Sequence, residues 1–157
     1  MEIDYRTINA DLGVSGSYTG PNKTFGSLIP IMTADDKVQS GKIHNLTLLF
    51  SGSTFQGNVD VVFHSSQSFI SSVQSVYTSS FSDLKSILAC VSLVGTSSLG
   101  TDFSQVGSHM VASLHNLNIP FNSDGVYVSS IFQHTGTQSF PSGSVWINIG
   151  YELGGAR

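Results

Sequence analysis

The chain has 157 residues, of which only 10% are charged, compared with about 25% in ordinary soluble domains. Six basic and ten acidic residues give a net charge of −4. Because the basic residues form no cluster, the composition argues against direct binding of nucleic acid, which depends on cations that neutralise phosphates. No apolar run approaches the ~20 residues of a membrane-spanning helix, and we predict neither a membrane span nor a signal peptide.

The first 30 residues show neither the period of a strand nor that of a helix, because isolated apolar side chains alternate irregularly with glycines. We predict an extended N-terminal arm over residues 1–30 and a β-sandwich domain over residues 31–157. The aromatic content of the arm is too high for a disordered tail, so we expect it to pack on its own domain or on a neighbouring subunit. The candidate contact residues of the arm are Ile3, Tyr5, Ile8, Tyr18 and Phe25.

Alternation of apolar and polar side chains begins at Gly41 and predicts two consecutive strands, 41–50 and 58–65. Turn residues separate them, so we expect a β-hairpin or meander in which the second strand has one wetter face. The side chains expected to face the core are Leu46, Leu48, Phe50, Val59, Val61 and Phe63.

Residues 66–92 fit two patterns. Phe69, Val73 and Tyr77 fit a helical stripe, whereas the many Ser and β-branched residues favour extended chain. Within 85–94 we prefer a strand that ends at Gly95 over a short helix capped at Ser82 and Asp83. Cys90 lies here and is the only cysteine, which excludes a disulfide framework, and we expect it to be a small buried residue.

The second half of the chain contains the clearest pattern. After a Gly/Ser/Thr-rich loop over 95–107, strands are expected over 109–115, 126–133 and 144–153. In the last of these, five apolar residues alternate with polar ones and are expected to face the core: Val145, Ile147, Ile149, Tyr151 and Leu153. Many strands with turn residues between them and no alternating helices predict an all-β fold, an antiparallel β-sandwich or jelly roll.

The motifs of common enzyme classes are absent from the sequence. No serine has glycines on both sides in the pattern of a nucleophile elbow, and no glycine-rich phosphate loop is present. The five histidines show no spacing typical of a metal site. We therefore predict that the protein is not an enzyme and uses no cofactor.

The polar face of the last strand is the second candidate contact surface. It carries Trp146 and Asn148, and its only charge is at Glu152. Trp146, with Tyr127 and Tyr151, is compatible with a platform on which sugars stack. A subunit interface is the preferred interpretation, because Trp and Tyr are enriched there and a solvated face would carry more charge.

Taken together, the aromatic-dotted arm of residues 1–30, the uncharged Ser/Gly/Thr-rich β domain and the short tail from Gly154 resemble small jelly-roll virion proteins. These are the head-decoration (cement) proteins of tailed phages and the small single-jelly-roll capsid proteins of other icosahedral viruses. The resemblance is one of style and architecture, without a specific motif.

The resemblance implies a non-catalytic homo-oligomer, often a trimer, that is located in the virion after assembly in the host cytoplasm. Its partner would be the major capsid protein or another virion protein, contacted by the arm and by the sandwich. Because the arm is not basic, we favour a decoration subunit over a small major capsid subunit. The alternative from another class is a receptor- or glycan-binding β-sandwich, such as a fibre tip or adhesin domain.

Overall fold

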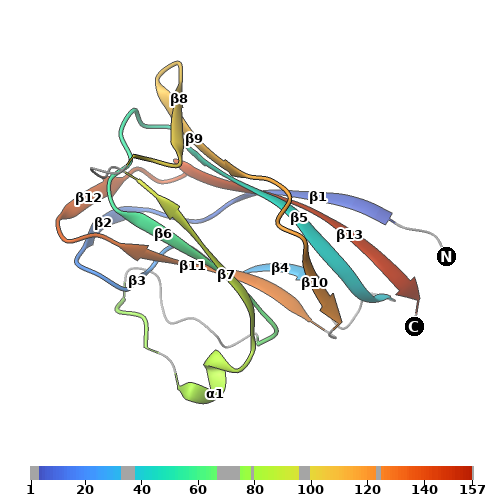
Figure 1. The fold of residues 1–157 in the computed structure, drawn as a ribbon. Coiled ribbons are helices and arrows are strands. Elements are labelled where there is room, and N and C mark those ends of the chain that lie inside the picture. Colours follow the sequence, from blue (N-terminus) through green and yellow to red (C-terminus); the bar gives the residue numbers. More distant parts are fainter. Residues whose placement is uncertain are drawn as a thin grey trace.

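The computed structural model describes residues 4–32, 38–66, 75–78, 80–95, 100–122 and 125–156. Two antiparallel sheets pack face to face, and the inner faces of both contribute to one hydrophobic core (Figure 1). In the first sheet the strand order is β1 (Asp4–Asp11), β13 (Val145–Ala156), β5 (Val38–Phe50), β9 (His109–Leu114) and β8 (Phe103–Val106), and β10 (Ile119–Asn122) also pairs with β5.

The second sheet and the smaller elements complete the domain. The second sheet has the order β3 (Lys23–Thr24), β11 (Val126–Gln133), β6 (Asn58–His64) and β7 (Ile87–Val94), and β4 (Ile29–Met32) also pairs with β11. The remaining elements are the pair β2 (Gly16–Thr19) and β12 (Thr137–Phe140) and the short helix α1 (Phe81–Leu84).

The pairing of early strands with late strands defines the topology. In the first sheet β1 pairs with β13, and in the second sheet β3 and β4 pair with β11. β5 then pairs with β13 and β9, while β6 pairs with β11 and β7. The chain is thus folded over so that its two halves run side by side in both sheets, which is the jelly roll. The predicted fold class is confirmed.

The alternation read from the sequence places the core residues correctly. The five apolar residues predicted for the last strand are 0 to 6% exposed, and the six predicted for β5 and β6 are 0 to 5% exposed. Because successive side chains of a strand point to opposite faces, this pattern fixes which side of each strand faces the other sheet.

An aromatic cluster closes one end of the sandwich. The ring of Phe25 stacks on Phe132 with a centroid distance of 5.2 Å, and it meets the rings of Phe140 and Tyr18 edge-on at 5.1 and 5.3 Å. Phe55, in the connection from β5 to β6, meets Phe25 edge-on at 6.3 Å. Stacked and edge-to-face pairs of this kind add to the stability that burial provides, so these rings join segments from distant parts of the sequence.

The predicted N-terminal arm is corrected by the structure. β1, β2 and β3 all lie within residues 4–30 and pair with β13, β12 and β11 of the same chain. Leu12, Val14, Tyr18 and Phe25 are 0 to 1% exposed. The aromatic and aliphatic side chains that suggested an arm are core residues here, because they fill the sandwich between the two sheets. Residue 30 is therefore not a boundary between an arm and the sandwich.

The predicted hairpin of residues 41–50 and 58–65 is wrong, since β5 and β6 belong to different sheets. The connection between them crosses the sandwich and buries Phe55, which a tight hairpin turn would not allow. The wetter face expected for β6 is also wrong, because Val62 and His64 are 3 and 0% exposed. Val62 packs with Ile131, and the partly buried Tyr77 lies against them.

The described residues of the ambiguous middle include one short helix and one strand. The strand preferred for 85–94 is confirmed as β7, and α1 precedes it with Ser80 as its N-cap. Phe69 and Val73 lie outside the described residues. Two details differ from expectation, since Phe103 begins a strand within the expected loop and Cys90 is exposed rather than buried.

We predict that Phe25→Ala lowers the free energy of unfolding by about 3–5 kcal/mol, because it leaves a cavity among four other aromatic rings. Urea denaturation followed by tryptophan fluorescence measures the change. Tyr5→Ala is the control, since Tyr5 is 71% exposed and its removal should alter the stability by less than about 0.5 kcal/mol. A similar loss in both variants would contradict the position of Phe25 in the core.

Candidate functional site

The outer face of the first sheet is arranged in rows of side chains that cross the strands. The first row consists of Asp11, Trp146, Leu49, Val111 and Ser104, in that order from β1 to β8. Residues opposite one another in neighbouring antiparallel strands have their Cβ atoms about 4.5–5.5 Å apart. The three central side chains of this row therefore form an apolar strip across β13, β5 and β9.

The second row contains only neutral polar side chains. It consists of Asn9, Asn148, Thr47 and Ser113. The hydroxyl groups of Thr47 and Ser113 lie 3.0 Å apart and share a hydrogen bond. The Oδ1 atom of Asn148 is buried and has no hydrogen-bond partner among the described residues.

The third row consists of Thr7, Gly150 and Asn45. The Asn45 side chain accepts a hydrogen bond of 3.0 Å from the backbone amide of Gly150. A Cβ atom at Gly150 would lie 2.6 Å from the accepting oxygen, which explains the glycine at this position. The second and third rows together contain no charged residue, and we call them the neutral rows.

Apart from Asp11, which lies beside Trp146, the charges described on this face gather at the opposite end. The fourth row contains Tyr5, Glu152 and Lys42. His44, from a bulge in β5, places its Nε2 atom 3.2 Å from the Glu152 carboxylate and stacks against the Tyr5 ring at 6.3 Å. The charged end and the neutral rows are thus clearly separated on one sheet.

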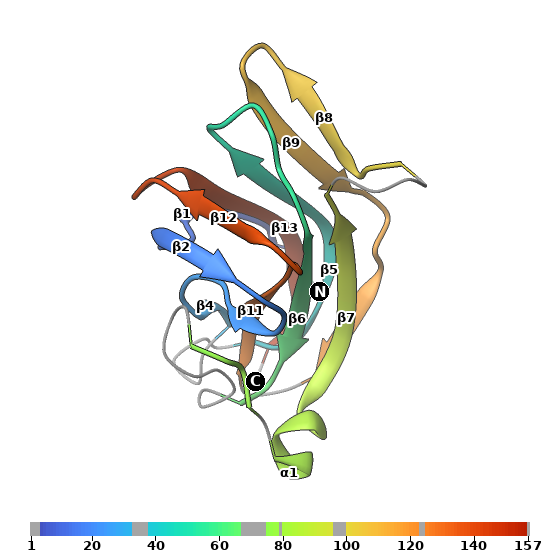
Figure 2. The ribbon, with the colours of Figure 1, turned by 90° about the vertical axis from the view of Figure 1, so that its left-hand side faces the viewer.

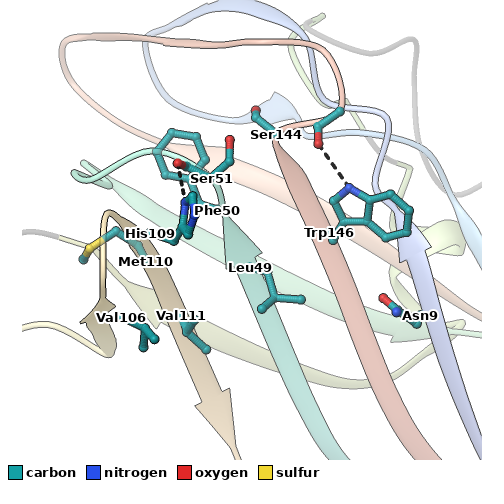
Figure 3. A pocket seen from close by; sticks show the side chains of 11 residues that line it. Asn9, Leu49, Phe50, Ser51, Val106, His109, Met110, Val111, Ser144 and Trp146 are labelled. Carbon is teal, nitrogen blue, oxygen red and sulfur yellow. Dashed lines mark hydrogen bonds between the residues drawn. The ribbon is translucent and has the colours of Figure 1, made fainter.

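At the opposite end the face is hollowed out (Figure 3). The hollow has a volume of about 520 Å³ and is lined mainly by aliphatic and aromatic side chains. Its principal walls are Trp146, Leu49, Val106, Met110 and Val111. The indole Nε1 donates a hydrogen bond of 3.1 Å to the Gly143 carbonyl, which fixes the orientation of the ring.

Two polar groups border the hollow. The Nδ1 atom of His109 lies 2.7 Å from the Ser51 carbonyl. Since a carbonyl only accepts hydrogen bonds, Nδ1 carries the hydrogen, and Nε2 remains available for a hydrogen bond to a ligand. The Ser144 hydroxyl is buried without a hydrogen-bond partner among the described residues. The hollow is therefore mainly apolar, with few groups that could orient a polar ligand.

Some of the predicted contact residues lie at the surface, and others lie in the core. Trp146 is 39% exposed and Tyr5 71% exposed, while Asn148 and Ile8 are half-buried. Tyr18 and Phe25 are buried in their own chain and present no surface to a neighbour. Ile3 lies outside the described residues.

The predicted aromatic platform is not formed. Tyr127 and Tyr151 are only 4 and 6% exposed, so neither joins Trp146 on the outer face. The sequence interpretation also missed Leu49 and Val111. Both were visible as apolar residues out of phase with the alternation of their strands, between Leu48 and Phe50 and between Met110 and Ala112.

A buried Ser–His pair lies on the other sheet. The His64 Nε2 atom is 2.6 Å from the Ser129 hydroxyl, and both residues are 0% exposed. Burial lowers the pKa of His64 to about 4, since a low-dielectric environment disfavours the charged imidazolium. The contact resembles that of a nucleophile and its base, but a substrate cannot reach a pair that is fully covered.

Two other features, a metal site and a membrane-spanning helix, are absent from the described residues. No three His, Cys, Asp or Glu side chains in this part of the chain are grouped so that they could hold a metal ion. Within the same ranges no helix has the length and apolar character to cross a membrane.

Comparison with known proteins gives matches in structure only. No family model and no curated protein sequence matches the chain. A structure of tomato aspermy virus matches 96% of this chain and 76% of its own, with 12% identity and a TM-score of 0.46. The coat protein of tobacco streak virus matches 99% of this chain and 86% of its own, with 8% identity and a TM-score of 0.37.

A subviral particle of infectious bursal disease virus also matches, with 13% identity and a TM-score of 0.40, over 96% of this chain but only 32% of its own. All three TM-scores are below 0.5. These similarities do not assign the chain to a family, and we base no functional conclusion on them.

The His64 environment predicts a pH dependence of stability. Because the pKa is lowered on folding, the unfolded chain binds more protons, and the free energy of unfolding falls as the pH drops from about 6.5 towards 4, by up to about 3 kcal/mol. Urea denaturation at several pH values measures this. His64→Gln should flatten the dependence over this range, whereas His115→Gln at an exposed site should leave it unchanged. An unaltered pH dependence in His64→Gln would disprove the assignment.

Proposed function

We propose that this protein is a virion structural protein, a homo-oligomeric subunit that decorates or cements a capsid shell. The observation that carries the proposal is the pair of neutral rows at the centre of the outer face. Burying a charge in an interface requires compensation for lost hydration, while neutral hydroxyl and amide groups can exchange water for hydrogen bonds to a partner. A face without charge at its centre is therefore suited to burial against another protein.

The absence of charge from the central rows of this face matches the composition of protein interfaces. Interface centres are depleted in charged residues and enriched in aromatic ones, and their rims are polar. Here the neutral rows lie between Trp146 at one end and the charged row of Glu152 and Lys42 at the other.

The edge of the sheet offers a second contact. β1 pairs with β13 on one side, and no described strand pairs with its other edge. An unpaired edge can accept a strand from another chain. Tyr5 and Ile8 lie on this strand. We infer that β1, as part of the sandwich, contributes the lateral contact that the sequence interpretation assigned to a free arm.

A decoration subunit is favoured over a major capsid subunit by the charge of the N-terminal strand. The guanidinium of Arg6 forms a 2.8 Å ion pair with Asp4, so β1 presents no net positive charge to a nucleic acid. We propose a position on the outside of a shell, in the virion, with the major capsid or another virion protein as partner. A trimer is the favoured oligomer.

The glycan-binding alternative has less support. Trp146 is half-exposed in a hollow, as a sugar-stacking residue would be, but Leu49, Val106 and Val111 surround it. Sugar hydroxyl groups need several hydrogen-bonding partners, and the apolar walls provide few.

We predict that Thr47→Lys weakens self-association or binding to shells by about 100-fold or more, because an unpaired buried charge in an interface costs about 3 kcal/mol or more. Thr47 lies in the second row. In the isolated subunit the long lysine side chain can extend to solvent, so the fold should be retained. Sedimentation velocity and co-sedimentation with capsid shells measure the two forms of association.

Thr135→Lys is the matched control, since Thr135 is exposed and lies in the connection between β11 and β12, outside the first sheet. It should associate as the unmodified chain does. Unimpaired association of Thr47→Lys, or failure of the unmodified chain both to self-associate and to bind shells, would refute the proposal.

A further inference from the structure

Two apolar features lie at opposite ends of the sandwich. One is the hollow beside Trp146. The other is a projection that we call the knob, formed by Phe81 and Leu84 of α1, which are 75 and 42% exposed. Residues three apart on a helix lie on the same face, so these side chains project together. Exposed apolar groups of this size commonly mark interaction sites.

Local hydrogen bonds hold the knob in place. The Ser80 hydroxyl accepts a hydrogen bond of 3.1 Å from the Asp83 amide, and the Asp83 carboxylate accepts one of 3.2 Å from the Ser80 amide. This reciprocal capping box stabilises the first turn of a helix. The Phe81 ring also lies 5.3 Å from the Lys85 ammonium. Because the turn is fixed, little conformational entropy is lost when a partner buries the knob.

The hollow has the character that an aromatic anchor needs. Val106 is 59% exposed and Trp146 is 39% exposed, and both border the same concave surface with Leu49 and Met110. Apolar area removed from water contributes roughly 25 cal/mol per Å². A phenyl ring entering the hollow would bury apolar surface on both partners.

A single chain cannot bring the two features together. The views in Figure 1 and Figure 2 both place α1 at one end of the sandwich and the β8–β9 hairpin, which borders the hollow, at the other. The knob of the same chain therefore cannot fill the hollow. A second copy of this chain supplies a knob with the required apolar chemistry.

Charges beside the two features are also complementary. Asp11 lies opposite Trp146 in the strand register. Gly143 lines the hollow, and the Asp11 carboxylate is 3.8 Å from the point where a Cβ atom would lie if Gly143 had a side chain. Lys85 flanks the knob. Neither Asp11 nor Lys85 forms an ion pair with a described residue. Opposite charges in such positions favour correct orientation during association.

We propose that the knob of one subunit inserts into the hollow of the next, with Lys85 approaching Asp11. This contact deepens the proposed function by identifying one partner as another copy of the chain. It joins two different surfaces, so it is heterologous, and repeated contacts generate a closed ring or an open filament. A trimer is one of the rings that such a contact can close.

The test uses two variants that each destroy one side of the contact, Phe81→Glu and Val106→Glu. Both positions are more than half exposed, so the fold should persist, and circular dichroism checks this. Each variant alone should associate at least about 30-fold more weakly than the unmodified chain, as expected for a central interface residue. Mixed together they should form a 1:1 heterodimer, since one intact knob and one intact hollow remain.

A charge exchange tests the orientation. Lys85→Glu should weaken association by up to about fivefold, the range of an exposed ion pair, and adding Asp11→Lys in the same chain should restore it. High salt screens an exposed ion pair. It should therefore remove the weakening caused by Lys85→Glu, and it should weaken the heterodimer only by the share that the ion pair contributes.

Three results would overturn the head-to-tail contact: a monomeric unmodified chain at all accessible concentrations, unaltered association of Phe81→Glu, or failure of the mixture to form a heterodimer. The proposed function is judged separately by Thr47→Lys and by binding to shells. Unaltered association of Phe81→Glu, together with loss of association in Thr47→Lys, would reject the knob contact and leave the function supported.

Discussion

The position of β13 between β1 and β5 is the constraint on which the rest of the structure depends. Its five inward side chains are 0 to 6% exposed. Because the side chains of a strand alternate with a period of two, a shift of one residue would move this whole set to the outer face. The burial of Val145 to Leu153 therefore fixes the register. That register in turn places Asp11 opposite Trp146 and Asn9 opposite Asn148, which creates the rows of the outer face.

The same constraint separates apolar from neutral polar groups on the two faces of one strand. Burial of the inner face stabilises the domain through the hydrophobic effect. On the outer face the backbone hydrogen bonds are already satisfied within the sheet, so only side chains such as Asn148 and Thr47 remain to bind a partner. Glu152 and Lys42, the charged residues of the fourth row, lie where His44 and solvent can compensate them. The centre of the outer face therefore loses less hydration free energy on burial than a charged surface would.

Predictions that depend on the local alternation of side chains were correct, and predictions of features that depend on contacts between distant segments were wrong. The inward residues of β5, β6 and β13 followed from the period of two, as did the all-β class. The separation of β5 from β6 did not, because it results from Phe55 packing among rings contributed by remote segments. For the same reason Tyr18 and Phe25 could not be recognised as core residues. Trp146 and Asn148 were identified on the outer face, but Leu49 and Val111 required the strand register.

Two chemically different surfaces on one subunit allow two kinds of contact. The neutral rows offer hydrogen-bonding groups, whose net contribution is small unless each finds a partner with good geometry, so they select a partner more than they strengthen binding. The knob and the hollow offer apolar surface, which contributes affinity with less demand on geometry. A subunit that forms a ring through apolar contacts can then present several copies of its neutral rows to one shell, and the linked contacts raise the overall strength of binding without any single strong interface.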